Sequence, residues 1–79
     1  MLEPWLCRAA RAALGWSRER LAEESGVSTP TIQRFERGEI GLYETVRKLR
    51  TALERGGVEF IEMTKDRGPG LTLRHGRKS

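Results

Sequence analysis

Between residues 28 and 37 the sequence concentrates hydrogen-bonding and basic side chains whose types suit contacts with nucleic acid. Gln33 carries both a donor and an acceptor, a combination that matches N6 and N7 of adenine. Arg34 matches O6 and N7 of guanine, or a phosphate. Thr29 offers a hydroxyl or a methyl group, whereas Pro30 offers at most an apolar contact with a thymine methyl. These residue types are suited to reading base edges.

A short helix is expected to present this segment. Ser28 is a good N-cap, and proline costs little in the first turn that follows. Ile32 and Phe35 are spaced as the apolar stripe of a helix, and Gly38 ends it. The apolar stripe would pack inward and leave the polar residues on the outer face.

The residues just before Ser28 predict a second short helix. Ser17 is the expected N-cap, and Gly26 closes the helix about nine residues later. Glycine permits the left-handed backbone that swings the chain through a sharp turn. Leu21 faces inward, and Val27 fills the space between the two helices. Two short helices joined in this way form a helix-turn-helix.

Two further helices and two strands complete the expected architecture. One helix begins at Pro4 and ends at Gly15, and another runs from about Tyr43 to Arg55. Two runs, Val58–Thr64 and Leu71–Arg74, read as strands around the turn Gly68-Pro69-Gly70. The expected fold class is therefore mainly α, with four helices followed by a short C-terminal β-hairpin. The expected units are a DNA-binding domain at 1–57, a β-hairpin dimerisation segment at 58–74 and a basic flexible tail at 75–79.

Composition narrows the classes of function. The chain has 79 residues, a formal net charge of +4 and a pI near 10.0, which favours phosphate backbones as partners. Cys7 is the only cysteine, so neither an internal disulfide nor a zinc cluster is expected, and a free thiol fits a reducing cytoplasm. His75 has no companion ligands. With no catalytic constellation, membrane span or phosphate-binding loop, we expect no enzyme, metal or cofactor.

Residues 6–55 resemble the lambda-repressor/Cro-like (XRE-type) helix-turn-helix family. The order and spacing match from the first helix to the fourth. The residues that carry the resemblance are Leu14-Gly15-Trp16-Ser17, Leu21-Ala22-Glu23, Ser25-Gly26-Val27-Ser28, Thr31-Ile32 and Phe35-Glu36-Arg37-Gly38. The resemblance implies a four-helix domain of the lambda-repressor type that binds duplex DNA.

The resemblance also implies roles for single residues. Thr29, Pro30 and Gln33 match positions that face base edges, and Arg34 lies beside them. Ser28 and Arg37 are the implied phosphate contacts near the two ends of the recognition helix.

Three other positions concern how the helices are held together. Arg18 matches a position usually held by a glutamine that braces the recognition helix. Because arginine replaces this amide, we expect the brace to be lost and a phosphate contact to take its place. Arg11 and Glu36 match a family ion pair that ties the first helix to the end of the recognition helix.

The strand pattern after residue 57 suggests a dimer. Val58 and Phe60 point to one face of an extended strand, whereas Ile61 and Met63 bring apolar groups to the other. A lone hairpin is marginal and leaves open edges, which a second copy would cover. The expected interface consists of Val58, Ile61, Met63, Leu71 and Leu73. A hairpin packed within a monomer is the alternative.

Together these features predict sequence-specific binding of double-stranded DNA by a small dimeric transcriptional regulator. The operator would be palindromic or pseudo-palindromic, and the setting bacterial, phage or mobile-element. We expect a cytoplasmic, nucleoid-associated protein with no small-molecule ligand. A protein-interaction module (an antitoxin or antiactivator) and a recombination-directionality or architectural factor remain open alternatives.

Overall fold

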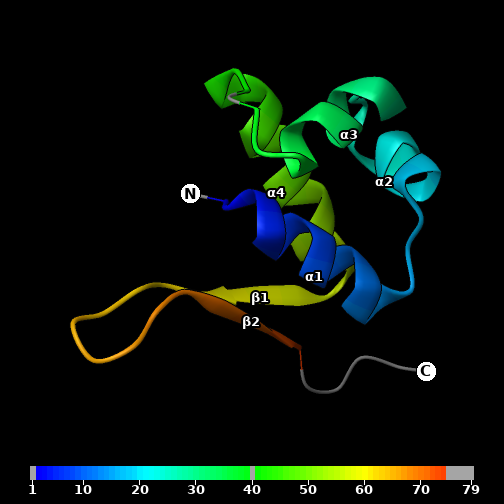
Figure 1. The fold of residues 1–79 in the computed structure, drawn as a ribbon. Helices are drawn as coiled ribbons and strands as arrows, with labels where there is room; N and C mark the ends of the chain where they lie inside the picture. The colour runs from blue at the N-terminus through cyan, green and yellow to red at the C-terminus, as the bar shows by residue number, and fades with distance from the viewer. Residues whose placement is uncertain (1, 40, 75–79) are drawn as a thin grey trace.

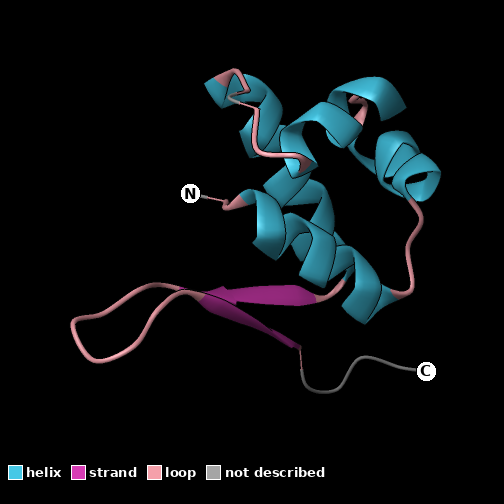
Figure 2. Ribbon diagram, viewed as in Figure 1, coloured by secondary structure: helices cyan, strands magenta, loops and turns pink. Residues whose placement is uncertain are grey.

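The computed structural model describes residues 2–39 and 41–74. Within them four helices precede a two-stranded antiparallel sheet (Figures 1 and 2). The elements are α1 (Pro4–Leu14), α2 (Arg18–Ser25), α3 (Thr29–Glu36), α4 (Tyr43–Gly56), β1 (Val58–Ile61) and β2 (Gly70–Leu73). The expected fold class is confirmed, and the tail at 75–79 lies outside the described residues.

The turn between α2 and α3 is defined by two serine caps and one glycine. Ser17 and Ser28 have extended backbones, and their side chains accept the backbone N–H groups of Arg20 and Thr31. Gly26 has a φ of 79°, in the left-handed region where glycine is favoured. The Oγ of Ser25 accepts the N–H of Val27 at 3.1 Å, which fixes the turn. These caps and the turn lie where the sequence predicted them.

One apolar core joins all four helices. Leu21 of α2, Ile32 of α3 and Leu49 of α4 are completely buried, and Leu6 of α1 is 3% exposed. Trp16 packs beside this core and also contacts α4 closely. A Cβ built on Gly56 would lie 2.7 Å from two carbons of its indole ring. Trp16 therefore needs a glycine at this point of α4.

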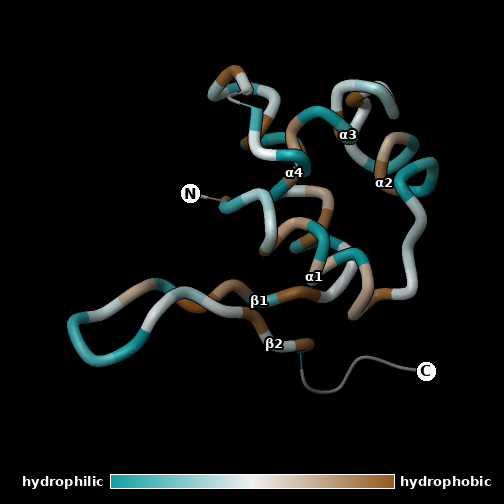
Figure 3. The backbone as a smooth tube through the Cα atoms, in the orientation of Figure 1, coloured by the Kyte–Doolittle hydropathy of each residue, from teal (hydrophilic) through white to brown (hydrophobic). Residues whose placement is uncertain are grey.

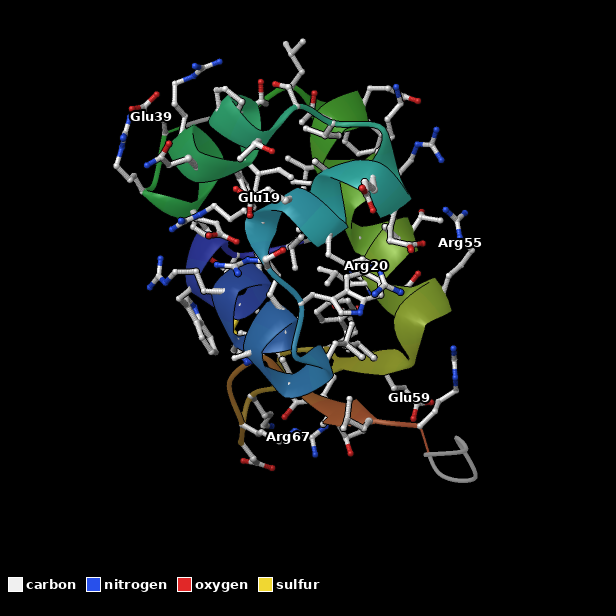
Figure 4. The ribbon with its side chains drawn as sticks, turned by 90° about the vertical axis from the view of Figure 1, so that its right-hand side faces the viewer. Glu19, Arg20, Glu39, Arg55, Glu59 and Arg67 are labelled. Atoms are coloured by element: carbon white, nitrogen blue, oxygen red, sulfur yellow. The ribbon has the colours of Figure 1, made fainter. Side chains whose placement is uncertain are left out.

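The hairpin packs against α1 and α4 and lies at the end of the molecule away from α3 (Figures 1 and 4). The first strand is shorter than predicted, because β1 ends at Ile61, and the second is shifted by one residue, to Gly70–Leu73. In Figure 3 the tip of the loop that joins the strands is hydrophilic, whereas both strands include hydrophobic segments. The strands pair within the chain, as in the monomer alternative.

The register corrects part of the expected dimer interface. Val58 pairs with Leu73 and Phe60 with Leu71, so these four residues share one face of the hairpin. Val58 is completely buried, and the other three pack against the core. The assignment of Val58 to an interface is therefore wrong, because a single copy already covers it. Leu71 and Leu73 also face the core, whereas Met63 is 70% exposed and Ile61 is half-buried.

Candidate nucleic-acid interface

The outer face of α3 carries the polar residues that the sequence singled out. Pro30, Gln33 and Arg34 of α3, and Arg37 at its C-cap, recur at the spacing of one helix face, and all four are exposed. On the opposite side Ile32 is completely buried and Phe35 is 6% exposed. The apolar residues thus hold α3 against the core and leave its polar face free.

The two residues at the start of α3 are less open than the rest of this face. Thr29 is half-buried. Ser28 is exposed, but its Oγ caps the helix and donates a hydrogen bond to Oγ1 of Thr31 at 2.8 Å. Contacts from these two residues to DNA remain predictions.

A buried carboxylate, Glu36, connects the end of α3 to α1. Glu36 is 2% exposed. Arg11 donates from Nε and Nη2 to the two carboxylate oxygens, at 2.8 and 2.9 Å, and this is the ion pair that the resemblance implied. Two parallel hydrogen bonds of this kind fix the orientation of both side chains. Arg11 also donates to the carbonyl of Trp16 at 3.1 Å, so the same guanidinium reaches the chain that leads into α2.

Arg18 of α2 lies against Glu36 as well. Its Nε donates to Oε1 of Glu36 at 3.1 Å, and its side chain is 39% exposed. The sequence led us to expect that the brace on α3 is lost when arginine stands at this position. The structure shows that Arg18 still ties α2 to the end of α3, through an ion pair. A phosphate contact from Arg18 stays a prediction.

Sequence reasoning missed two further contacts of Glu36. The Sγ of Cys7 donates to its Oε2 at 3.3 Å, and Arg8 donates to its backbone carbonyl. Cys7 is completely buried, as expected for a small apolar side chain, yet it also makes this polar contact. The helical spacing of Cys7, Arg8 and Arg11 on α1 is visible in the sequence, but their shared target lies 25 to 29 residues away.

The contacts around Glu36 shift the pKa values of Glu36, Cys7 and Arg11, and the hydrogen bond to Glu36 raises that of Arg11. Burial alone would raise the pKa of Glu36, but hydrogen bonds from Arg11, Cys7 and Arg18 outweigh it and hold the pKa below its usual range. Burial and the neighbouring Glu36 charge raise the pKa of the Cys7 thiol far above its usual range. Glu36 is therefore a charged anchor, and Cys7 stays a neutral thiol at physiological pH.

A carboxylate that the sequence analysis did not single out lies beside the exposed face of α3. Glu39 accepts a hydrogen bond from Nη2 of Arg37 at 3.0 Å, and its Oε1 lies 3.9 Å from Nε of Arg34. Arg34 and Glu39 also line a pocket of about 290 Å³ with Thr31, Leu42 and Thr45, among others. The candidate DNA face thus includes one acidic residue among its basic ones.

The described residues 2–39 and 41–74 contain no group of three His, Cys, Asp or Glu placed to hold a metal ion. His75 lies outside them. No helix in these ranges is long and apolar enough to cross a membrane.

Comparison with known proteins agrees with this geometry. A family model described as helix-turn-helix matches residues 8–59, a range that includes α2, α3 and all of α4. No curated protein matches the chain. The family is one of DNA-binding transcription regulators. The matched range, the capped turn at Gly26 and the exposed face of α3 lead to one conclusion: the chain belongs to the XRE/lambda-repressor-like helix-turn-helix family.

Proposed function

We propose that the protein binds specific sequences in duplex DNA by placing α3 in the major groove, and that it regulates transcription in this way. The observation that carries the proposal is the exposed row of Pro30, Gln33, Arg34 and Arg37 on a helix whose other side is locked into the core. A helix with one free polar face fits the width of the major groove.

Each side chain of this face has a proposed role. Gln33 and Arg34 read base edges, supported by Pro30 and Thr29 at the start of the helix. Arg37 and Ser28 contact phosphates and set the position of α3 on the duplex. Arg18 adds a phosphate contact with the part of its guanidinium that Glu36 leaves free.

We further propose that two copies bind a pseudo-palindromic site as a dimer. Ile61 and Met63 are the interface residues that remain after Val58, Leu71 and Leu73 are assigned to the core side. The two-stranded sheet leaves an open edge on each strand within the described residues. Because the hairpin lies away from α3 (Figure 1), a second copy there would not cover the proposed DNA face. With duplex DNA as its ligand, we place the protein with the nucleoid in the cytoplasm.

Selection of binding sites from random duplexes tests this function. We expect an enriched motif, and we expect fluorescence anisotropy to give a steep salt dependence on it. Arg18 and Arg37 doubled in a dimer would neutralise four phosphates, so log affinity should fall against log salt with a slope of about −4. Failure to enrich any motif, together with a flat salt dependence, would exclude the proposed function.

A further inference from the structure

Both arginines of the proposed DNA face share one acidic neighbour, Glu39. Its Oε2 accepts from Nη2 of Arg37 at 3.0 Å, and its Oε1 lies 3.9 Å from Nε of Arg34. The position of Glu39 is fixed by the backbone, since its N–H donates to the carbonyl of Arg34 at 3.1 Å. The intervening Gly38, with a φ of 101°, turns the chain back toward the helix.

We propose that Glu39 is a specificity-determining residue, which weakens binding to nonspecific DNA while leaving Arg34 able to read a base. This inference rests on the proposed function of α3. It assigns to Glu39 a role that the sequence motif does not contain.

Charge explains the first half of the proposal. Nonspecific binding depends on the attraction between basic side chains and phosphates, and it carries no information about sequence. Arg34, Arg37 and Glu39 together carry a charge of +1, whereas the two arginines alone would carry +2. The carboxylate also repels an approaching phosphate. On nonspecific DNA both arginines depend on phosphates, so Glu39 lowers that affinity more than the affinity for a site where Arg34 contacts a base.

Geometry explains the second half. Glu39 approaches the guanidinium of Arg34 at Nε, 3.9 Å away, and not at its terminal nitrogens. Nη2 donates to the hydroxyl of Thr31 at 3.4 Å, which is a long and easily exchanged hydrogen bond. A bidentate contact with O6 and N7 of guanine needs these terminal groups, and the base edge carries no full negative charge for Glu39 to repel. The specific contact is thus compatible with Glu39 in place.

The pairs are weak enough for DNA to compete with them. The side chains of Arg34, Arg37 and Glu39 are 53%, 58% and 53% exposed. Ion pairs at such exposure contribute little and are screened by salt. Glu39 therefore modulates binding and does not block it.

The test compares Glu39→Gln and Glu39→Ala with the full wild-type chain on two probes. One probe is a random-sequence duplex, and the other is the strongest duplex from the selection. We expect both variants to bind the random duplex about three- to tenfold more tightly, as loss of two exposed ion pairs implies. On the selected duplex the gain should stay below about twofold, so the specificity ratio falls. The difference should shrink at high salt.

Glu59→Gln is the matched control. It removes the same charge from β1, which Figure 4 shows at the end of the molecule away from Glu39. Because Glu59 lies two residues from Ile61 on the same strand, sedimentation first establishes that this variant has the oligomeric state of the wild type, and we then expect it to bind both duplexes like the wild type. An equal gain in Glu59→Gln would mean that overall net charge, and not the position of Glu39, sets nonspecific affinity.

The remaining outcomes separate the two proposals. If the wild type prefers its selected site but the Glu39 variants bind both probes unchanged, or both equally more tightly, only the role of Glu39 is overturned. Weaker binding of both probes would show that Glu39 holds the arginines in their binding geometry. That result would also overturn the proposed role of Glu39 in specificity. A wild type that binds no duplex would remove the proposed function and this inference with it.

Discussion

Glu36 receives hydrogen bonds from side chains of α1 and α2, so a single carboxylate connects three helices at the end of α3. Its two arginine partners differ in the number of hydrogen bonds they make and in their exposure. Arg11 makes two short bonds and is 16% exposed, whereas Arg18 makes one bond and is 39% exposed. The desolvation that burial imposes on Glu36 is offset mainly by Arg11, because its bonds are bidentate and shielded from water.

Removal of Arg11 should therefore destabilise the domain. We expect Arg11→Met to lower the free energy of unfolding by on the order of 2 kcal/mol, less than for a fully orphaned buried charge because Arg18 remains. The double variant Arg11→Met/Glu36→Leu should recover part of this loss, because no unpaired charge stays buried. Urea denaturation of the wild type, both single variants and the double variant at pH 7 measures the coupling.

Acid provides the control for this coupling. The pKa of Glu36 is lowered in the folded protein, so its ion pairs add stability above the ordinary glutamate pKa. That contribution is lost as the pH falls through the lowered, folded-state pKa. The coupling between Arg11 and Glu36 should accordingly shrink when the same cycle is repeated in strong acid. Additive losses at pH 7 would argue against an energetically important pair.

Two variants should distinguish side chains that read bases from side chains that position the protein on the phosphate backbone. Gln33→Ala should lose about 1–3 kcal/mol on the selected site and relax the preference at one base pair, because an amide that matches adenine is removed. Arg37→Ala should weaken binding to all sequences by similar factors, because phosphate contacts do not depend on sequence. Anisotropy titrations on selected and random duplexes distinguish the two. Equal weakening of both duplexes by Gln33→Ala would show that Gln33 does not read a base.

At the scale of elements, the position of α3 depends on its neighbours more than on its own length. An eight-residue helix is marginal in isolation, so packing must stabilise it. Ile32 and Phe35 supply the apolar contacts, and Glu36 locks the far end. On the other side of the core, Trp16 packs against Gly56 at the end of α4.

The contact between Trp16 and α4 can be tested by adding one methyl group. Gly56→Ala would place a Cβ 2.7 Å from the indole ring and 3.0 Å from Cδ1 of Leu14. Overpacking of this kind costs about 1–3 kcal/mol, more than the roughly 0.5–1 kcal/mol that alanine gains over glycine in a helix. Urea denaturation should therefore show a net loss of stability. Gly68→Ala is the control, because no atom lies within 4 Å of its added Cβ, and a more stable Gly56→Ala would contradict this packing.

At the scale of the whole molecule, the register separates the side of the hairpin that faces the core from the side that we propose for the dimer. Val58, Phe60, Leu71 and Leu73 complete the core of one copy, and the ring of Phe60 lies under the guanidinium of Arg50 at 5.0 Å. Met63 has no such cover, and Ile61 has only part of it. The hairpin therefore packs against the helices with one side and leaves apolar surface at Ile61 and Met63, which we propose that a second copy covers.

The proposed dimer should be sensitive to a charge at Ile61 or Met63. We expect Ile61→Lys and Met63→Lys to convert a sedimenting dimer into a folded monomer, and to weaken operator binding by about 10²-fold as the linkage of two half-sites is lost. Ala12→Lys adds the same charge at an exposed position of α1 and should leave the dimer intact. Circular dichroism confirms that each variant is folded. A wild type that sediments as a monomer, or lysine variants that still dimerise, would place the interface elsewhere.

The local structure was predictable from the sequence because its determinants lie within a few residues of each other. Caps at Ser17 and Ser28, the left-handed turn at Gly26 and the apolar spacing on α3 all act over one or two helical turns. The family motif adds the identity of the recognition helix. These features determined the order of the elements and the face of α3 proposed to meet DNA.

Only the tertiary structure decided which distant side chains meet. The contact of Arg18 with Glu36 joins residues 18 positions apart, and the relative placement of α2 and α3 determines whether an arginine there reaches a carboxylate or solvent. Similarly, alternation along a strand places Val58 and Ile61 on opposite faces, but pairing with β2 and packing on α1 and α4 determine which face is buried. Such contacts depend on the packing of whole elements, which no local pattern of residues specifies.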